Sequence, residues 1–330
     1  MRGAMLLVVA AACGNGGPGS DAAPKQCDYT EKSDATNDAQ SEMTGLMIGA
    51  GTQELCGNLD NGHYDAVTKT VDLDTFRVTA AAQADLRVRF FGATGVENLT
   101  EFSVLVFSTD TAPVLLNGAY FDATLGDHGV FRASLPPGTY DIVVRARAGA
   151  DNAAPIGYKV RFLPDLECPQ IAKPSYTEQH DGASNTGNDQ LAIDFSKNPV
   201  ASMIAGTAES TGLKIDPFTQ DRISGTAAMV SGPDGYMDRD TYVFTTGALT
   251  NELSVRLDWP GGADLDYVVF AAMATTPTGA STVASQTGPE LAIFAAKPGT
   301  QYWLWVGAAK SSTTLPVTYD AAVCGEHAAP

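Results

Sequence analysis

Pairs of aspartates that are separated by one residue and followed by Thr and an aromatic residue occur twice in the chain. Asp72 and Asp74 form the first pair, and Asp238 and Asp240 form the second. In an extended strand, residues two apart project from the same face, so each pair presents two neighbouring carboxylates. Calcium prefers about six to eight oxygen ligands of this kind. The spacing therefore suggests a calcium site in each copy, with ordinary strand-entry aspartates as the alternative.

An acidic segment precedes each pair and supplies further oxygen ligands. Phe76 and Val78 continue the face of Asp72 and Asp74, which predicts that both aspartates lie just outside the core at the end of a strand. If the preceding segment folds back over that end, the first candidate site contains Glu31, Asn37, Asp38, Asp72 and Asp74. The second candidate site contains Glu178, Asn188, Asp189, Asp238 and Asp240.

The aspartate pairs belong to an internal duplication. The two copies of D-x-D-T-aromatic are 238 − 72 = 166 residues apart, and Pro-Gly-Thr recurs at an offset of 299 − 138 = 161. Tyr-Thr-Glu recurs at an offset of 176 − 29 = 147. Three echoes in the same order predict two homologous units, and 330 residues are enough for two domains with separate cores.

Each unit shows short alternating segments separated by turns, without a long segment of helical period. We therefore expect an all-β chain of two tandem jelly-roll or β-sandwich domains, with about eight strands each. The expected domains span residues 27–167 and 168–330.

The motifs of these units resemble the bacterial pre-peptidase C-terminal domain. The second unit resembles it at 188–189, 238–242, 263–270 and 298–302, and the first at 37–38, 72–76 and 137–144. The first unit lacks the A-D-L-D strand motif in its middle segment, at 98–107. The resemblance implies a jelly-roll sandwich, here in two copies without a peptidase. In calcium-dependent collagen-binding members of the family, similar acidic residues hold calcium, which favours the two candidate sites.

The N-terminus has the features of an export signal. Residues 1–12 contain a short basic start and an apolar run that is too short to span a bilayer. Ala10-Ala11-Ala12-Cys13 resembles a lipobox, which implies lipidation of Cys13 and a flexible tether over residues 13–26. The alternative is an ordinary signal peptide with an incidental cysteine. We expect an exported bacterial outer-membrane lipoprotein that contacts the membrane through its N-terminal lipid.

Four cysteines remain after Cys13 is set aside, and an even number in an exported chain predicts disulfides. Four cysteines allow three connectivities. Cys168 and Cys324 lie at matching ends of the two units, so we favour Cys168–Cys324 with Cys27–Cys56. Each of these two bonds then stays within its own unit.

Composition and motifs restrict the possible functions. The formal net charge of −18 disfavours nucleic acid and anionic lipid as partners. The histidines at 63, 128, 180 and 327 stand in no zinc-hydrolase motif, and we interpret them as polar loop residues. Trp303 and Trp305 share one strand face, either as core packing, which we favour, or as an exposed platform for sugar or peptide.

These observations predict a non-catalytic module for binding, adhesion or scaffolding at the cell surface. Its expected ligand is an extracellular protein, peptide or polysaccharide, and calcium is the one cofactor indicated. The alternatives are a secreted hydrolase with an unrecognised site and a purely structural surface spacer.

Overall fold

The computed structural model describes most of the chain after the tether. The described residues are 27–32, 40–59, 67, 70–93, 95–121, 126–147, 155–165, 168, 173–179, 208–228, 236–271, 279–281, 288–309 and 311–329. The expected signal peptide, Cys13, the tether to residue 26, and the candidate ligands Asn37, Asp38, Asn188 and Asp189 lie outside these ranges.

The first half of the chain forms a sandwich of two five-stranded sheets, in the order β1-β3-β10-β5-β8 and β2-β4-β9-β6-β7. Its strands are β1 (Tyr29–Thr30), β2 (Glu42–Ile48), β3 (Gln53–Leu59), β4 (Thr70–Ala80), β5 (Ala84–Gly92), β6 (Glu101–Ser108), β7 (Leu115–Tyr120), β8 (Gly129–Leu135), β9 (Gly138–Arg147) and β10 (Ile156–Pro164). A single 3-10 turn, η1 (Val96–Asn98), accompanies them, and no α-helix occurs among the described residues.

The second half repeats this architecture strand by strand, with sheets β11-β13-β20-β15-β18 and β12-β14-β19-β16-β17. Its strands are β11 (Tyr176–Thr177), β12 (Glu209–Ile215), β13 (Gln220–Ala227), β14 (Tyr236–Thr246), β15 (Glu252–Asp258), β16 (Leu265–Ala271), β17 (Gly279–Ser281), β18 (Glu290–Ala295), β19 (Gln301–Ala309) and β20 (Val317–Glu326). Adding ten to each strand number of the first half reproduces both sheet orders. The predicted all-β class with two tandem sandwiches is therefore confirmed.

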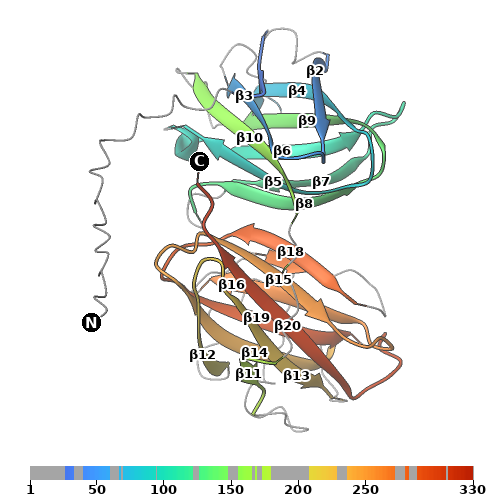
Figure 1. Cartoon of the computed structure of the whole chain (residues 1–330), viewed down its shortest axis with the longest axis vertical. Helices are drawn as coiled ribbons and strands as arrows, with labels where there is room; N and C mark the ends of the chain where they lie inside the picture. Colours follow the sequence, from blue (N-terminus) through green and yellow to red (C-terminus); the bar gives the residue numbers. More distant parts are fainter. Residues whose placement is uncertain are drawn as a thin grey trace, which may run out of the picture.

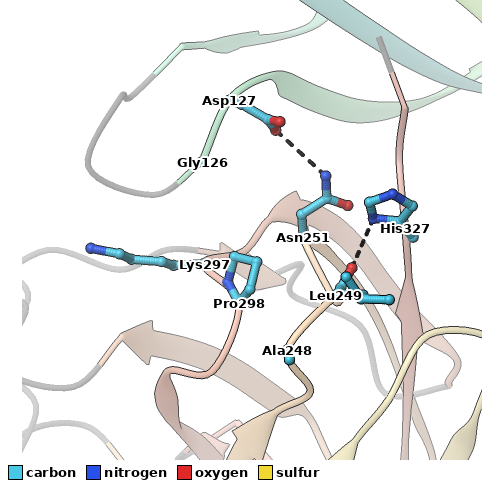
Figure 2. A pocket seen from close by; sticks show the side chains of 8 residues that line it. All are labelled: Gly126, Asp127, Ala248, Leu249, Asn251, Lys297, Pro298 and His327. Atoms are coloured by element: carbon cyan, nitrogen blue, oxygen red, sulfur yellow. Dashed lines mark hydrogen bonds between the residues drawn. The ribbon is translucent and has the colours of Figure 1, made fainter.

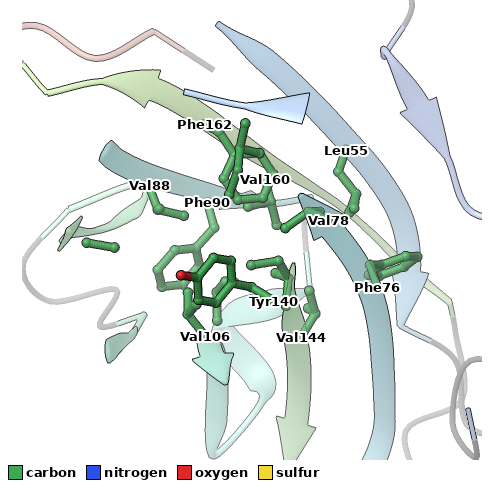
Figure 3. Packing of buried hydrophobic residues seen from close by; sticks show 14 of the residues in the cluster. Leu55, Phe76, Val78, Val88, Phe90, Val106, Tyr140, Val144, Val160 and Phe162 are labelled. Carbon is green, nitrogen blue, oxygen red and sulfur yellow. The ribbon is translucent and has the colours of Figure 1, made fainter. Parts of the chain in front are cut away.

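The core of each sandwich lies between its two sheets, and strand alternation explains which residues enter it. In the first sandwich, Phe76 and Val78 of β4 face Val88 and Phe90 of β5 within one buried cluster (Figure 3). Gly129, which opens β8, leaves room for the Phe90 ring, because a β-carbon at this position would overlap it. The alternation of apolar residues along these strands therefore decides which side chains form the core.

The strand count differs from the expectation of about eight, because ten strands are described in each half. The local pattern does not delimit β3, because its polar residues Gln53, Glu54 and Asn58 interrupt the apolar alternation, although the strand pairs with β10. The pattern also does not show that β2 pairs with β4 in parallel, since a parallel pair is not joined by a tight turn.

Both favoured disulfides are present. Cys27 is bonded to Cys56, and Cys168 is bonded to Cys324. The first bond joins the entry of the first sandwich to β3, and the second joins the entry of the second sandwich to its last strand, β20. Two disulfides indicate that the chain folds in an oxidising compartment, as exported proteins do.

The two sandwiches lie one above the other along the longest axis of the molecule, and the C-terminus of the chain returns to the junction between them (Figure 1). Strands β8 of the first sandwich and β18 of the second approach each other there. Within the described ranges, no helix is long and apolar enough to cross a membrane.

Candidate functional site

The predicted aspartate pairs are buried more deeply than the sequence suggested. Asp72 and Asp74 of β4 are both 0% exposed, and Asp238 and Asp240 of β14 are 4% and 2% exposed. The alternation was correct, since Phe76 and Val78 continue into the core. The expected position just outside the core was wrong, because a neighbouring tyrosine and backbone amides enclose the carboxylates.

In the first sandwich, three of the predicted residues meet around Tyr158 of β10. The Tyr158 hydroxyl donates to Asp74 Oδ2 at 2.7 Å, and the Asn58 amide donates to Glu31 Oε2 at 2.8 Å. Burial raises the pKa of the Tyr158 hydroxyl well above its usual range, and the charges of Asp74, Glu31 and Asp72 raise it further. Three carboxylates from two separate segments therefore act on one buried hydroxyl.

The same cluster recurs in the second sandwich. Tyr319 of β20 donates to Asp240 Oδ2 at 2.6 Å, and the Thr226 amide donates to Glu178 Oε2 at 2.8 Å. Tyr242 adds a second hydroxyl, 2.7 Å from that of Tyr319. We call Glu31, Asp72, Asp74 and Tyr158, together with Glu178, Asp238, Asp240 and Tyr319, the two acid–tyrosine clusters.

Crowding of negative charge is the main electrostatic feature of the second cluster. Burial raises the pKa of the Asp240 carboxyl well above its usual range, and the charges of Glu178 and Asp238 raise it further. A bound cation would oppose both effects, because it stabilises the ionised form. The all-oxygen donor set fits a hard cation such as calcium. The residues that the structure describes nevertheless contain no group of three or more His, Cys, Asp and Glu side chains arranged to hold a metal.

Sequence reasoning missed the two tyrosines, although a signal was present. Tyr158 and Tyr319 are 319 − 158 = 161 residues apart, the offset also shown by the repeated Pro-Gly-Thr. They sit at equivalent places in β10 and β20. A comparison of the closing strands at that offset would have added both residues to the candidate sites.

Trp303 and Trp305 of β19 are both buried, at 8% and 0% exposed. They project from the face opposite Tyr302 and Leu304, which enter the core of the second sandwich. Trp305 lies against Gly307, where a β-carbon would overlap the indole. The favoured placement in the core is therefore wrong, because Tyr302 and Leu304 take the core face, and the exposed platform is wrong too, because both indoles are buried on the opposite face.

A second concentration of charged groups lies at the junction of the sandwiches and was not predicted. Arg87 and Arg89 of β5 point away from the core of the first sandwich, since Leu86, Val88 and Phe90 take the core face. Arg89 makes a bidentate contact with Glu252 of β15, with both nitrogen–oxygen distances at 2.7 Å.

Further contacts extend this pair into a network. Arg87 Nη1 lies 3.0 Å from Glu252 Oε1, and Arg89 Nη2 lies 2.8 Å from Glu326 Oε2 at the end of β20. Arg87 also pairs with Glu326. His128 Nε2 lies 3.2 Å from Glu252 Oε2. We call Arg87, Arg89, His128, Glu252 and Glu326 the junction clamp.

The clamp corrects the interpretation of the histidines. His128 is 0% exposed and stacks on Phe91, with ring centroids 5.4 Å apart, so it is not a solvated loop residue. His327 is exposed, and its Nδ1 lies 2.9 Å from the Leu249 carbonyl oxygen. His63 and His180 lie outside the described residues.

The clamp predicts a specific dependence of stability on pH. Burial alone would raise the pKa of Glu252, but hydrogen bonds from His128 and Arg89 and the charges of both arginines lower it from 4.5 to about 2. Above pH 4.5 the contribution of Glu252 is complete. Below it the unfolded chain takes up the proton first, so about 3 kcal/mol of stability is lost as the pH falls towards 2.

Unfolding by urea at several pH values between 5 and 2 measures this loss. The Glu252→Gln variant is the matched comparison, because it keeps the shape and removes the titration. We expect a steeper loss for the natural protein than for the variant, and equal slopes would contradict the assignment. Asp240, whose pKa is raised, acts in the opposite direction in both proteins and cancels from the difference.

Comparison with known proteins gives no family assignment. No protein-family model matches the chain, and no curated protein matches it. Among solved structures, the pre-peptidase C-terminal domain of a collagenase from Bacillus anthracis is 20% identical, with a TM-score of 0.25, and the match covers 35% of this chain and 95% of that one.

Two further structures match over more of the chain. The PBSX exported protein XepA is 11% identical, with a TM-score of 0.26, over 85% of this chain and 88% of that one. The tandem CBM51 modules of a family 98 glycoside hydrolase from Streptococcus pneumoniae are 10% identical, with a TM-score of 0.22, over 82% and 84%. Likeness of this degree assigns no activity or ligand to the chain.

Proposed function

We propose that the chain is an exported, non-catalytic module of two joined β-sandwiches of the pre-peptidase C-terminal type, stabilised by calcium at its acid–tyrosine clusters. In this proposal Cys13 is lipidated and holds the module at the outer membrane through the tether of residues 13–26. The module then binds or scaffolds an extracellular protein, peptide or polysaccharide.

The observation that carries the proposal is the recurrence of the same cluster in both sandwiches. Each cluster brings a glutamate from the entry segment near two aspartates of β4 or β14 and a buried tyrosine of β10 or β20. Each cluster also confines three carboxylates around a buried hydroxyl, an excess of negative charge that a hard cation would neutralise. Asn37, Asp38, Asn188 and Asp189 would complete the two sets of oxygen ligands.

The calcium part predicts a change in thermal stability. We expect the midpoint of unfolding in excess EDTA to rise by several degrees when calcium replaces the chelator. A ligand at about 100 times its Kd adds about 2.7 kcal/mol, and about 1 kcal/mol shifts the midpoint of a domain of this size by about 2 to 4 °C. Differential scanning calorimetry of the full chain measures the shift.

The Asp240→Asn variant makes this test specific. Asparagine keeps an acceptor for Tyr319 and removes a carboxyl group whose pKa is raised by burial and by neighbouring charges. Because ionised Asp240 is unfavourable in this cluster without a cation, the variant in EDTA should be as stable as the natural protein or more stable. The second sandwich of this variant should then show no rise in its unfolding midpoint when calcium is added. Asp74→Asn tests the first sandwich in the same way, and exposed Asp110→Asn is the control. An unchanged midpoint in the natural protein would reject calcium binding.

A further inference from the structure

The junction contains a cavity of about 420 Å³ that is open to solvent and lined by residues of both sandwiches (Figure 2). Asp127 comes from the loop before β8, and Leu249, Asn251, Lys297, Pro298 and His327 come from three segments of the second sandwich. The volume falls within the range of small-ligand pockets, about 300 to 1,000 Å³. Because its walls come from both sandwiches, the cavity exists only while the junction is closed.

Two polar side chains of this cavity, Asp127 and Asn251, are held by contacts within the protein. Asp127 Oδ1 is 2.8 Å from Nδ1 of the buried His128, which the clamp holds through Glu252. Asn251 donates to the Ala328 carbonyl at 2.8 Å and lies 3.5 Å from Asp127 Oδ1. Such preorganisation lowers the entropic cost of binding.

Apolar and cationic groups complete the lining. Leu249, on a turn of the second sandwich, is 63% exposed and lines the cavity with an apolar side chain. Pro298 and the exposed Lys297 also line the cavity, and the Lys297 side chain extends away from Asn251 and His327 (Figure 2). The cavity therefore offers an apolar surface, a carboxylate acceptor and an ammonium donor.

We propose that this cavity binds one sugar residue of an uncharged glycan. Asp127 accepts hydrogen bonds from ring hydroxyls, Lys297 donates to hydroxyl oxygens, and Leu249 and Pro298 pack against the C–H groups of the ring. The charges favour a neutral ligand, since the net charge of −18 and Asp127 oppose an anion, and Lys297 opposes a cation. Hydroxyl groups both donate and accept, which suits a pocket that presents both kinds of partner.

This inference rests on the proposed binding function and narrows its ligand to a saccharide, but it does not require calcium. Titration of the full chain with methyl glucoside, methyl galactoside and N-acetylglucosamine, followed by ligand-observed NMR, tests it. We expect saturable, millimolar binding of at least one of them. Lys297→Ala and Leu249→Ala should each weaken that binding about tenfold, the loss expected for one hydrogen bond to a charged group or one buried apolar contact.

Neither Lys297 nor Leu249 belongs to the junction clamp, so both variants should leave the clamp intact. Asp110→Asn, on an exposed turn after β6, should bind as the natural protein does. Absence of saturable binding of all three sugars would overturn the proposal, as would unchanged affinity, relative to the natural protein, of the Lys297→Ala and Leu249→Ala variants. Tighter binding of glucuronate or of triglycine than of the neutral sugars would also overturn it. The effect of calcium on thermal unfolding is a separate measurement. Failure of sugar binding and failure of calcium binding can therefore be distinguished.

Discussion

Replacing Arg89 with alanine is expected to lower the free energy of unfolding by about 3 to 5 kcal/mol, the usual cost of removing one partner from a buried ion pair. Arg89 is 7% exposed and Glu252 is 0% exposed. Without Arg89, Glu252 loses its bidentate partner and keeps Arg87 and His128 as its remaining contacts in the clamp. Urea unfolding measures the loss, and small-angle scattering should show a larger radius of gyration as the sandwiches separate.

The chain contains a matched control for this change. Arg77 forms a bidentate pair with Asp141 on the outer face of the first sandwich, with both nitrogen–oxygen distances at 2.9 Å. The Arg77 side chain is 34% exposed, so Arg77→Ala should cost about 1 kcal/mol or less and leave the scattering profile unchanged. Equal losses for the two variants would show that the clamp does not hold the junction.

The parts of the structure that depend on local pattern could be predicted from the sequence. Alternation placed Phe76 and Val78 in the core, and it placed Asp72 and Asp74 on the same face. The matching positions of Cys168 and Cys324 in the two units identified the disulfide. Each of these inferences needs only strand geometry or the register of the duplication.

The parts that depend on how the sandwiches meet could not be predicted. The alternation around Arg87 and Arg89 marks an outward, charged face, but no sequence signal pairs that face with Glu252, 163 residues away from Arg89. Trp303 shows a second limit, which lies within one sandwich. By strand register Trp303 corresponds to Asp141, and Val243 corresponds to Arg77, so the same outer face is charged in the first sandwich and apolar in the second.

Removing the Cys168–Cys324 bond should be the most destabilising change among those considered. It joins residues 156 apart, whereas Cys27–Cys56 joins residues 29 apart. The loss of loop-closure entropy in the unfolded chain predicts about 5 kcal/mol for the longer loop and about 3.5 kcal/mol for the shorter one. Paired Cys→Ala variants, compared by urea unfolding under oxidising conditions, measure both losses, and alanine avoids burying a new hydroxyl group.

The order of these two losses separates unfolded-state effects from native contacts. The entropic account predicts that the loss of stability increases with the length of the closed loop. A larger loss on removing Cys27–Cys56 than on removing Cys168–Cys324 would contradict that account. Cys324 also lies two residues before Glu326 on β20, so the bond helps to position a member of the clamp. We therefore expect Arg89→Ala to cost less in the Cys168→Ala, Cys324→Ala background than in the natural protein, because interacting sites are not additive. Full additivity would mean that the disulfide stabilises only the second sandwich and leaves the junction to its charges.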